Sequence, residues 1–427
     1  MASFSFGAGN AAKLLRIPFY AAGRLATLVI PRTADGWVFG CGAGIGDGAL
    51  ALWNAAAPDH PGAVWLVGSD REAADAAARG IATVRKNSLR GFWRTARARV
   101  VVVTHGFGDV NRYGVSGAFV VQLWHGIPLK RIGIDSPVTV RVPRAIERTP
   151  LAPIARRLLA VLYRATTRGI DVIPAASQLV RGRLESAFSL PDDRVPVTGE
   201  PRVDVLAHGD PADRRATARA AIAAATGPFD PATRIVLYAP TWRDGEQDPA
   251  IPDAHDWAAL TEILRREDAL LLVRSHPLGA GEYLPPAPTD RVRSLGSGLV
   301  PDVTPILPGI DVLITDYSSL IFDSALVPVP VVYLAPDAED YSRTRGFYGS
   351  YDDVAESGWA RDWVSVIPRL AAVLGDAEDH QRRIEHARAV SSRVHEFRDG
   401  RNTERVYRAI LSRLGRARRD LRPEGVS

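Results

Sequence analysis

The sequence has 427 residues, of which 46% are hydrophobic and 24% charged, and its formal net charge is +5. With a mean hydropathy of −0.04, it is typical of a soluble globular chain of about two to three domains and is not a disordered one. The single cysteine, Cys41, excludes an intramolecular disulfide and a cysteine-rich zinc or iron–sulfur site, and favours a reducing compartment.

The N-terminal segment, residues 1–32, is predicted to be amphipathic. Its longest apolar stretch, Leu14 to Pro31, is interrupted by Arg16, Pro18 and Arg24, so it lacks the roughly 20 apolar residues in a row that a membrane span needs. The same charges argue against a signal peptide. Two alternatives stay open: a helix that lies in a membrane interface, and a helix packed on the first domain.

Short apolar runs alternate with alanine-rich helical patterns in the first part of the chain. The runs have the length and composition of buried parallel strands, and helices such as residues 49–57 and 71–78 separate them. This alternation predicts an α/β domain of Rossmann-like type over residues 33–170. The predicted strands are Val38–Cys41, Ala63–Val67, Val100–Val103 and Ala118–Leu123.

The alternation restarts after a predicted helix at Ile154–Thr167 and indicates a second Rossmann-like domain over residues 171–395. Residues 396–427 are predicted to be a basic helical segment. The predicted strands are Asp171–Pro174, Arg194–Thr198, Arg234–Tyr238, Ala269–Val273, Val312–Thr315 and Val329–Leu334, and the predicted helices are Ser177–Phe188, Arg214–Ala225 and Trp257–Arg266.

Polar clusters follow four of these strands. Because ligands of parallel α/β sheets bind beyond the carboxyl ends of the strands, we expect the functional site in a central cleft between the two domains. The clusters are residues 124–131 (WHGIPLKR), 274–277 (RSHP), 238–244 (YAPTWRD) and 315–319 (TDYSS).

Ser318 and Ser319 open a predicted helix, whose free N–H groups suit a phosphate, although ordinary capping explains such residues equally well. The chain has no P-loop, and residues 42–47 (GAGIGD) lack the GxGxxG spacing, so a nicotinamide cofactor is disfavoured. Acidic residues do not cluster as a two-metal site requires. We therefore expect phosphate handling by dipoles, arginine and histidine, with no metal and no cofactor.

Histidine is the side chain best suited to accept a proton near neutral pH. His125 and His276 each end a strand, in opposite domains, and are the candidate catalytic pair. His105 also follows a strand and is left undecided. The other histidines are read as structural: His60, His208, His255, His380, His386 and His395.

Positive charge gathers in two segments. Residues 130–168 hold nine Lys or Arg and two acids, and residues 381–422 hold thirteen Arg and five acids. Such surfaces suggest an anionic partner: a nucleic acid, an anionic membrane leaflet or a polyphosphate. Arginines paired on solvated helix faces are an equally open alternative.

Taken together, the ordered motifs resemble the CDP-glycerol glycerophosphotransferase family, the teichoic acid primases and polymerases. The resemblance covers roughly Gly36 to Arg408. One departure is Ile127, where many members have threonine. The motifs are WHG at 124–126 with PLK at 128–130, GEPRVD at 199–204, PTWR at 240–243, RSHP at 274–277, DVLITDYSS at 311–319, Asp323, Tyr333, RGFY at 345–348 and FRDG at 397–400.

The resemblance implies a GT-B fold, attached peripherally to the cytoplasmic face of the membrane. It implies transfer of glycerol phosphate from CDP-glycerol, or a similar CDP-alditol, to a hydroxyl of a lipid-linked acceptor, with release of CMP. His125 would accept the hydroxyl proton and His276 would stabilise the leaving CMP, or the two roles are exchanged. The implied substrate-binding residues are Trp124, Gly126, Arg202, Pro240, Thr241, Arg243, Ser275, Ser318, Ser319 and Asp323.

In this light the basic segments predict contact with anionic lipid or a polyanionic acceptor, and no nucleic acid. The alternative function is that of a GT-B glycosyltransferase using a nucleotide sugar, which shares the fold. No motif chooses glycerol over ribitol, or a single addition over chain extension.

Overall fold

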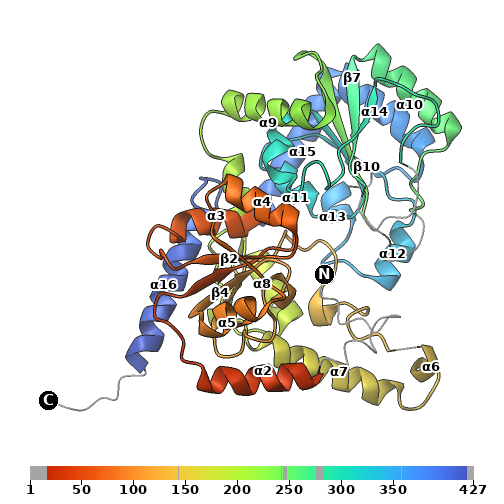
Figure 1. Cartoon of the computed structure of the whole chain (residues 1–427). Coiled ribbons are helices and arrows are strands. Elements are labelled where there is room, and N and C mark those ends of the chain that lie inside the picture. The colour runs from red at the N-terminus through yellow and green to blue at the C-terminus, as the bar shows by residue number, and fades with distance from the viewer. Residues whose placement is uncertain are drawn as a thin grey trace. The chain divides into compact units, whose positions relative to one another are not determined.

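The computed structural model describes residues 17–142, 144–241, 243, 248–275, 283–356 and 358–420. The chain divides into two compact units. Unit 1 contains the chain up to residue 125, residues 132–204 and the chain from residue 401 on, and unit 2 contains residues 126–131 and 205–400. The chain therefore passes between the units more than once, as the colours of Figure 1 show.

Unit 1 is built on a parallel sheet of five strands in the order β3-β2-β1-β4-β5. Its strands are almost entirely apolar because helices cover a parallel sheet on both faces. The order reverses between β1 and β4, which is where ligands of open α/β sheets bind. The strands are β1 (Trp37–Phe39), β2 (Val64–Val67), β3 (Thr83–Arg85), β4 (Val100–Val103) and β5 (Phe119–Gln122).

The helices of unit 1 include one that returns from the end of the chain. This helix, α16, packs against α3 and places Val406 and Ile410 in the core of the first sheet (Figure 1). The helices are α2 (Ile17–Val29), α3 (Asp47–Ala56), α4 (Asp70–Ala78), α5 (Leu89–Arg97), α6 (Arg144–Glu147), α7 (Ala152–Thr167), α8 (Gln178–Phe188) and α16 (Asn402–Asp420).

Unit 2 has a second parallel sheet of five strands, in the order β10-β9-β6-β7-β8. Its order reverses between β6 and β9. The strands are β6 (Arg234–Ala239), β7 (Ala269–Val273), β8 (Val292–Ser294), β9 (Val312–Thr315) and β10 (Val331–Tyr333). The helices are α9 (Pro211–Thr226), α10 (Ala254–Arg266), α11 (Leu320–Ser324), α12 (Ala338–Thr344), α13 (Asp352–Ala355), α14 (Trp363–Gly375) and α15 (Ala377–Val394).

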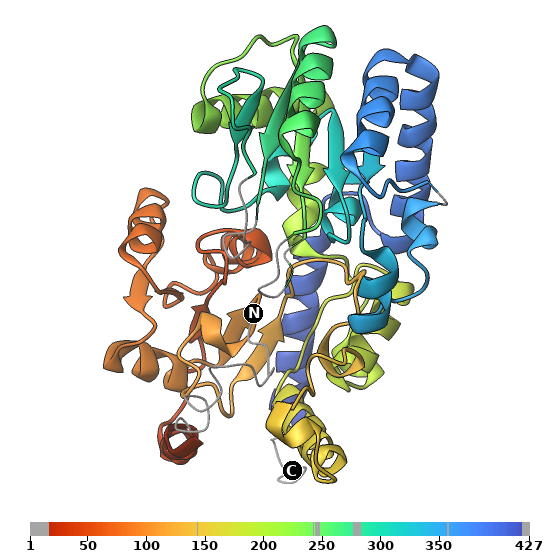
Figure 2. The same ribbon diagram turned by 90° about the vertical axis from the view of Figure 1, so that its right-hand side faces the viewer.

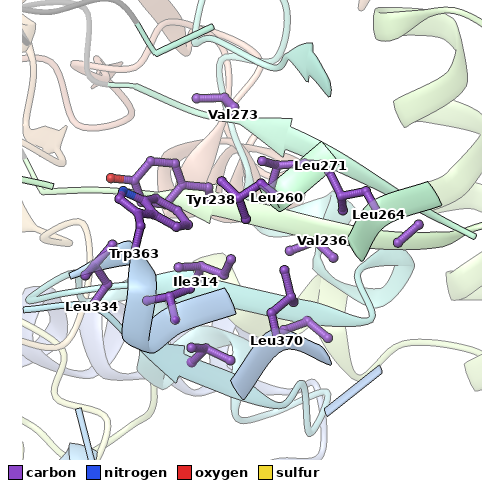
Figure 3. Close-up of a cluster of buried hydrophobic side chains, with 14 of the residues drawn as sticks. Val236, Tyr238, Leu260, Leu264, Leu271, Val273, Ile314, Leu334, Trp363 and Leu370 are labelled. Carbon is purple, nitrogen blue, oxygen red and sulfur yellow. The ribbon is translucent and has the colours of Figure 1, made fainter. Parts of the chain in front are cut away.

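The core on one face of the second sheet is closed by α10 and α14 (Figures 2 and 3). Trp363 and Tyr238 pack edge to face with ring centroids 5.0 Å apart. Both are fully buried, and both satisfy their polar atom on one acceptor, because Trp363 Nε1 and Tyr238 OH each donate to the Ala250 carbonyl at 2.8 Å. Burial therefore leaves neither polar atom without a partner.

The structure differs from the sequence prediction at the domain boundary and at the sheet edges. Residues 171–204 lie in unit 1 rather than at the start of the second domain, because Val172 bridges Val121 and Ala175 bridges Val197 beside the first sheet. The predicted strands there form only these isolated bridges. The sequence also missed β3 and β8, which are short edge strands with polar residues. Edge strands lack the continuous apolar signal of central ones.

Candidate functional site

Two histidines meet at the carboxyl ends of neighbouring strands in unit 1. Strands β4 and β5 pair in parallel, with Val103 opposite Gln122, so the residues that follow them reach the same edge of the sheet. His105 and His125 stack there, with ring centroids 4.2 Å apart and ring planes 4° from parallel. The structure thus brings the undecided His105 into contact with the predicted catalytic His125.

Thr104 holds both rings. Its carbonyl faces His125 Nδ1 at 3.4 Å and also accepts from Gln122 Nε2 at 2.8 Å. Because a carbonyl can only accept, Nδ1 of His125 carries the proton and Nε2 keeps its lone pair. The Thr104 hydroxyl lies 2.8 Å from His105 Nδ1.

Burial lowers the pKa of the His125 imidazole well below its usual range, and the neighbouring His105 adds to this effect, while the bond to the Thr104 carbonyl opposes it. The pKa of His105 is also lowered, first by burial. At neutral pH His125 is therefore uncharged, with Nε2 free to take a proton. This is the protonation state that a general base requires.

The two residues beside His125 have unusual backbone conformations. Trp124 has φ +63° and its indole contacts both the His125 ring, at 4.3 Å between centroids, and Phe188 of α8, at 5.1 Å. Gly126 has φ +143°, a region that favours glycine. Ile127 is fully buried, which explains why an apolar side chain is tolerated at this departure from the family pattern.

Arg202 lies in a turn that belongs to unit 1. It is 9% exposed and pairs with the buried Glu200 at 3.5 Å, and its positive charge contributes to lowering the pKa of His125. The turn is fixed by α16, because Asp204 accepts the N–H groups of Asn402 and Thr403 at 3.0 and 2.7 Å. The turn that carries the GEPRVD motif is therefore held by hydrogen bonds to the start of α16.

In unit 2 the cluster after β6 and β9 is a network of ion pairs. Arg243 is 8% exposed and donates to Asp316 at 2.9 Å and to both oxygens of Asp337 at 2.8 and 2.9 Å. Burial alone would raise the pKa of Asp337, but Arg243 and Tyr317 hold it below its usual value. The predicted substrate-binding Arg243 is therefore already paired, and it orders the loops instead of offering a free cation.

Thr241 is positioned by the same network. Its backbone N–H donates to Asp316 Oδ1 at 2.9 Å, and its carbonyl accepts from Arg243 Nη1 at 2.6 Å. The side-chain oxygen Oγ1 is buried, yet it has no hydrogen-bond partner among the described residues. A buried hydroxyl without a partner is costly in a protein interior, so Thr241 has a hydrogen bond to offer a ligand.

Ser318 and Ser319 precede α11, as predicted, but this helix has only five residues. Ser318 Oγ accepts from the Leu320 N–H at 3.2 Å, a local bond two residues along the chain, while Ser319, the N-cap residue, makes no side-chain capping bond. Asp323, in α11, is 2% exposed. Pro240 and Ser275 are partly buried directly after β6 and close to the end of β7, while His276 lies outside the described residues.

The sequence missed Lys130 as a site residue, although it belongs to the same motif as His125. Residues 129–131 are bound to the RGFY motif inside unit 2: Tyr348 N–H donates to the Leu129 carbonyl and Arg131 N–H to the Gly346 carbonyl, both at 3.0 Å. Burial lowers the pKa of Lys130 to about 8, although Asp316 opposes this. Lys130 therefore lies within electrostatic range of Asp316 and Arg243. The lysine of the motif at residues 128–130 could have identified it from the sequence.

Two further features of the described residues lie apart from the predicted site residues or are explained by the histidine network. The ligand atoms of Cys41, Asp47 and His105 lie within 4.8 Å of one another. However, burial and Asp47 raise the pKa of the Cys41 thiol, and Thr104 Oγ1 already bonds its sulfur at 3.3 Å, so we assign these groups to the histidine network and not to a metal. A cavity of about 430 Å³ lies beside β10, α14 and α15, and none of the predicted site residues lines it.

Two Rossmann-like units, with polar side chains following their strands, are the architecture of the GT-B fold class. The family described as CDP-Glycerol:Poly(glycerophosphate) glycerophosphotransferase matches residues 41–412, and the chain belongs to it. The predicted family, fold class and enzyme class are confirmed.

Individual relatives agree with this assignment. The teichoic acid glycerol-phosphate transferase of Staphylococcus aureus is 25% identical over 77% of this chain and 80% of its own length. The teichoic acid ribitol-phosphate polymerase TarK of the same organism is 27% identical over 53% of this chain but only 42% of its own length. The structure of the wall teichoic acid polymerase TagF superposes with a TM-score of 0.73 at 20% identity, covering 96% of this chain and 97% of that one, which shows the shared fold.

Proposed function

We propose that this protein transfers glycerol phosphate, or a related polyol phosphate, from CDP-glycerol or a similar CDP-alditol to a hydroxyl of a lipid-linked acceptor in teichoic-acid-like polymer synthesis. The family match over residues 41–412 supports the class of reaction. The observation that carries the chemistry is the neutral His125, whose Nδ1 is held on the Thr104 carbonyl.

The acceptor hydroxyl is a poor nucleophile until it loses its proton. In the proposed step the acceptor oxygen attacks the phosphorus that bears glycerol, and His125 Nε2 takes the hydroxyl proton. A new P–O bond forms, the bond between that phosphorus and the bridging oxygen of the pyrophosphate breaks, and CMP leaves with the electron pair. The donor itself supplies the leaving group.

Unit 2 would hold the donor. Thr241 offers a hydroxyl that has no partner within the described part of the chain, Ser318 and Ser319 offer hydroxyls and N–H groups, and Lys130 offers a positive charge to the phosphates. His276 is the second proposed catalytic residue, on the motif that carries it, and would stabilise the leaving CMP. Three proposed substrate-binding residues lie beside the base: Trp124, Gly126 and Arg202. The others would set the conformation of the loops that bind the donor: Arg243, Pro240, Ser275 and Asp323.

The direct test is CMP release from CDP-glycerol and from CDP-ribitol, with membranes as the acceptor source. His125→Ala and His276→Ala are expected to lose about 10²- to 10⁴-fold in rate, the usual contribution of a general acid or base. His255→Ala, which removes an exposed histidine on α10, serves as the matched control. Release of UDP or GDP from a nucleotide sugar, with no CMP from either donor, would instead establish the glycosyltransferase alternative.

We further propose peripheral attachment to the cytoplasmic face of an anionic membrane. Within the part of the chain that the structure describes, no helix combines the length and apolar character needed to cross a bilayer. Two helices of unit 1, α2 and α7, lie at the same end of that unit (Figures 1 and 2) and carry large apolar side chains that are 51–81% exposed. These side chains are Phe19, Leu25, Leu28 and Val29 on α2 and Ile154, Leu158, Val161 and Leu162 on α7.

Exposed arginines accompany the apolar residues on α7, namely Arg156, Arg157 and Arg164. An apolar face with basic flanks suits the interface of an anionic leaflet. Flotation with anionic vesicles is expected to recover the wild type and to lose Leu158→Glu, whereas Val364→Glu, at an equally exposed position in unit 2, should bind normally. Binding that ignores both salt and Leu158→Glu would contradict this attachment.

A further inference from the structure

His105 is the side chain that the reaction above leaves without a task, although it contacts the proposed base. Its ring is stacked on the ring of His125, with the two ring centroids 4.2 Å apart. Gly42 makes room for it on the chain that follows β1, because a Cβ at position 42 would come within 2.5 Å of His105 Cγ. The position of the ring is therefore defined by the backbone of two strand ends.

A buried carboxylate fixes the loop that carries His105. Asp109 is 5% exposed, and its Oδ2 accepts the N–H groups of Thr104 at 2.9 Å and of His105 at 2.7 Å. The Thr104 hydroxyl, which faces His105 Nδ1, lies 3.3 Å from the same oxygen. One residue, Thr104, thus contacts both imidazoles, by its carbonyl on one side and its hydroxyl on the other.

Charge couples the two rings. Like charges about 4 Å apart repel, so a proton on one ring of the stacked pair disfavours a proton on the other. The titratable or charged groups near the pair are Asp109, Cys41 and Asp47 from the strand ends of unit 1 and Arg202 from its turn, and the uncharged polar neighbours are Thr104 and Gln122. The protonation of each ring therefore depends on the protonation of the other.

We propose that His105 is a positioning residue for His125: the stacked ring holds the base in its orientation on the Thr104 carbonyl and makes the proton affinity of the base a property of the pair. This inference rests on the proposed function, since it assigns His125 as the base. It predicts that loss of the ring misplaces His125, and that loss of its titration alone changes the pH at which the base becomes active.

Two variants separate these effects, measured as pH profiles of kcat/KM for CMP release. His105→Phe keeps a flat ring without a proton site, and it should keep most of the activity while the acid limb moves to higher pH by about half a unit to one unit, because a repelling neighbour has been removed. His105→Ala removes the ring, and it should lower kcat by about 10- to 100-fold with little change in KM, the size of a positioning loss.

His60→Phe is the matched control. His60 is also in unit 1 and stacks on an aromatic ring, that of Trp37, with centroids 4.6 Å apart, but His125 is not its partner. Its pH profile should match the wild type. If the acid limb of His105→Phe and the kcat of His105→Ala both match His60→Phe while His125→Ala is inactive, the inference about His105 is overturned and the proposed function stands.

If His125→Ala itself releases CMP at the wild-type rate, the base assignment fails first. A measurement that needs no activity covers this case and any variant that folds poorly. NMR of the full-length protein with labelled histidine should show His125 titrating in wild type at a lower pH than in His105→Phe. Identical titration of His125 in both proteins would overturn the coupling.

Discussion

The two units stabilise the polar groups at their strand ends in different ways. In unit 1 the two rings face uncharged atoms of Thr104, whose carbonyl lies at His125 and whose hydroxyl lies at His105, while the carboxylate of Asp109 binds the main chain of the loop. In unit 2 the corresponding positions form ion pairs, in which Arg243 joins Asp316 and Asp337.

The difference follows from what each unit is proposed to do. A general base must change its protonation state, and a fixed negative charge beside a histidine would favour the protonated form. A donor site must present hydroxyls, amides and a cation in a fixed arrangement, and buried charge pairs supply rigid geometry once every partner is in place. Unit 1 is therefore expected to respond to pH, and unit 2 to the loss of any one charge.

Breaking one ion pair in unit 2 should have the largest effect on stability. Arg243→Met leaves the buried Asp316 and the partly buried Asp337 without their cation, and it should lower the free energy of unfolding by about 3–5 kcal/mol, the usual cost of an uncompensated buried charge. Urea denaturation monitored by tryptophan fluorescence measures this. A loss below about 1 kcal/mol, the range of an exposed pair, would show that the network does not hold unit 2 together.

A substitution at Thr241 tests donor binding in unit 2 separately from stability. Thr241→Val removes only the hydroxyl that has no partner among the described residues, so stability should stay the same or rise slightly. KM for the CDP-alditol should increase by about 5- to 10-fold, the value of one hydrogen bond of about 1–1.4 kcal/mol. Thr241→Ser should restore KM, and an unchanged KM in Thr241→Val would remove Thr241 from the donor site.

Lys130 gives unit 2 a pH dependence of its own. Burial lowers its pKa to about 8, whereas the unfolded chain keeps the ordinary lysine value of about 10.4. Between these values the unfolded state binds more protons, so the contribution of Lys130 to stability rises as pH increases from 8 to 10. The free energy of unfolding of wild type, measured relative to Lys130→Met, should therefore rise across this window; a constant difference would contradict the lowered pKa.

The smallest effect is expected where ion pairs face solvent. Asp75 on α4 and Arg79, the residue that follows this helix, pair at 3.1 Å, and the side chains of Arg79 and Asp75 are 48% and 40% exposed. Arg79→Met should change stability by less than about 0.5 kcal/mol, because exposed pairs gain little over hydration. A loss comparable to that of Arg243→Met would show that burial is not what makes the unit 2 network matter.

Much of the fold was visible in the sequence. The apolar runs that predicted central strands, such as Val100–Val103 and Ala269–Val273, coincide with β4 and β7, because a strand buried on both faces needs a continuous apolar run. The order of polar clusters after these strands, together with the motif series, was enough to predict the family. Charge patterning left two alternatives open. Within residues 381–422, Arg382 and Arg383 pair with Asp379 on the same helix, while contact of the basic segments with an anionic partner stays a prediction.

By itself, the sequence determined the two α/β units, the family and the candidate residues, since periodicity and motif spacing are local properties of the chain. Only the tertiary structure decided which of those residues are available to a substrate. Arg243 and His105 look alike in sequence, each a polar residue shortly after a strand. The partners that hold Arg243 in ion pairs and stack His105 on the proposed base lie 20 to 94 residues away, a separation that no local pattern encodes.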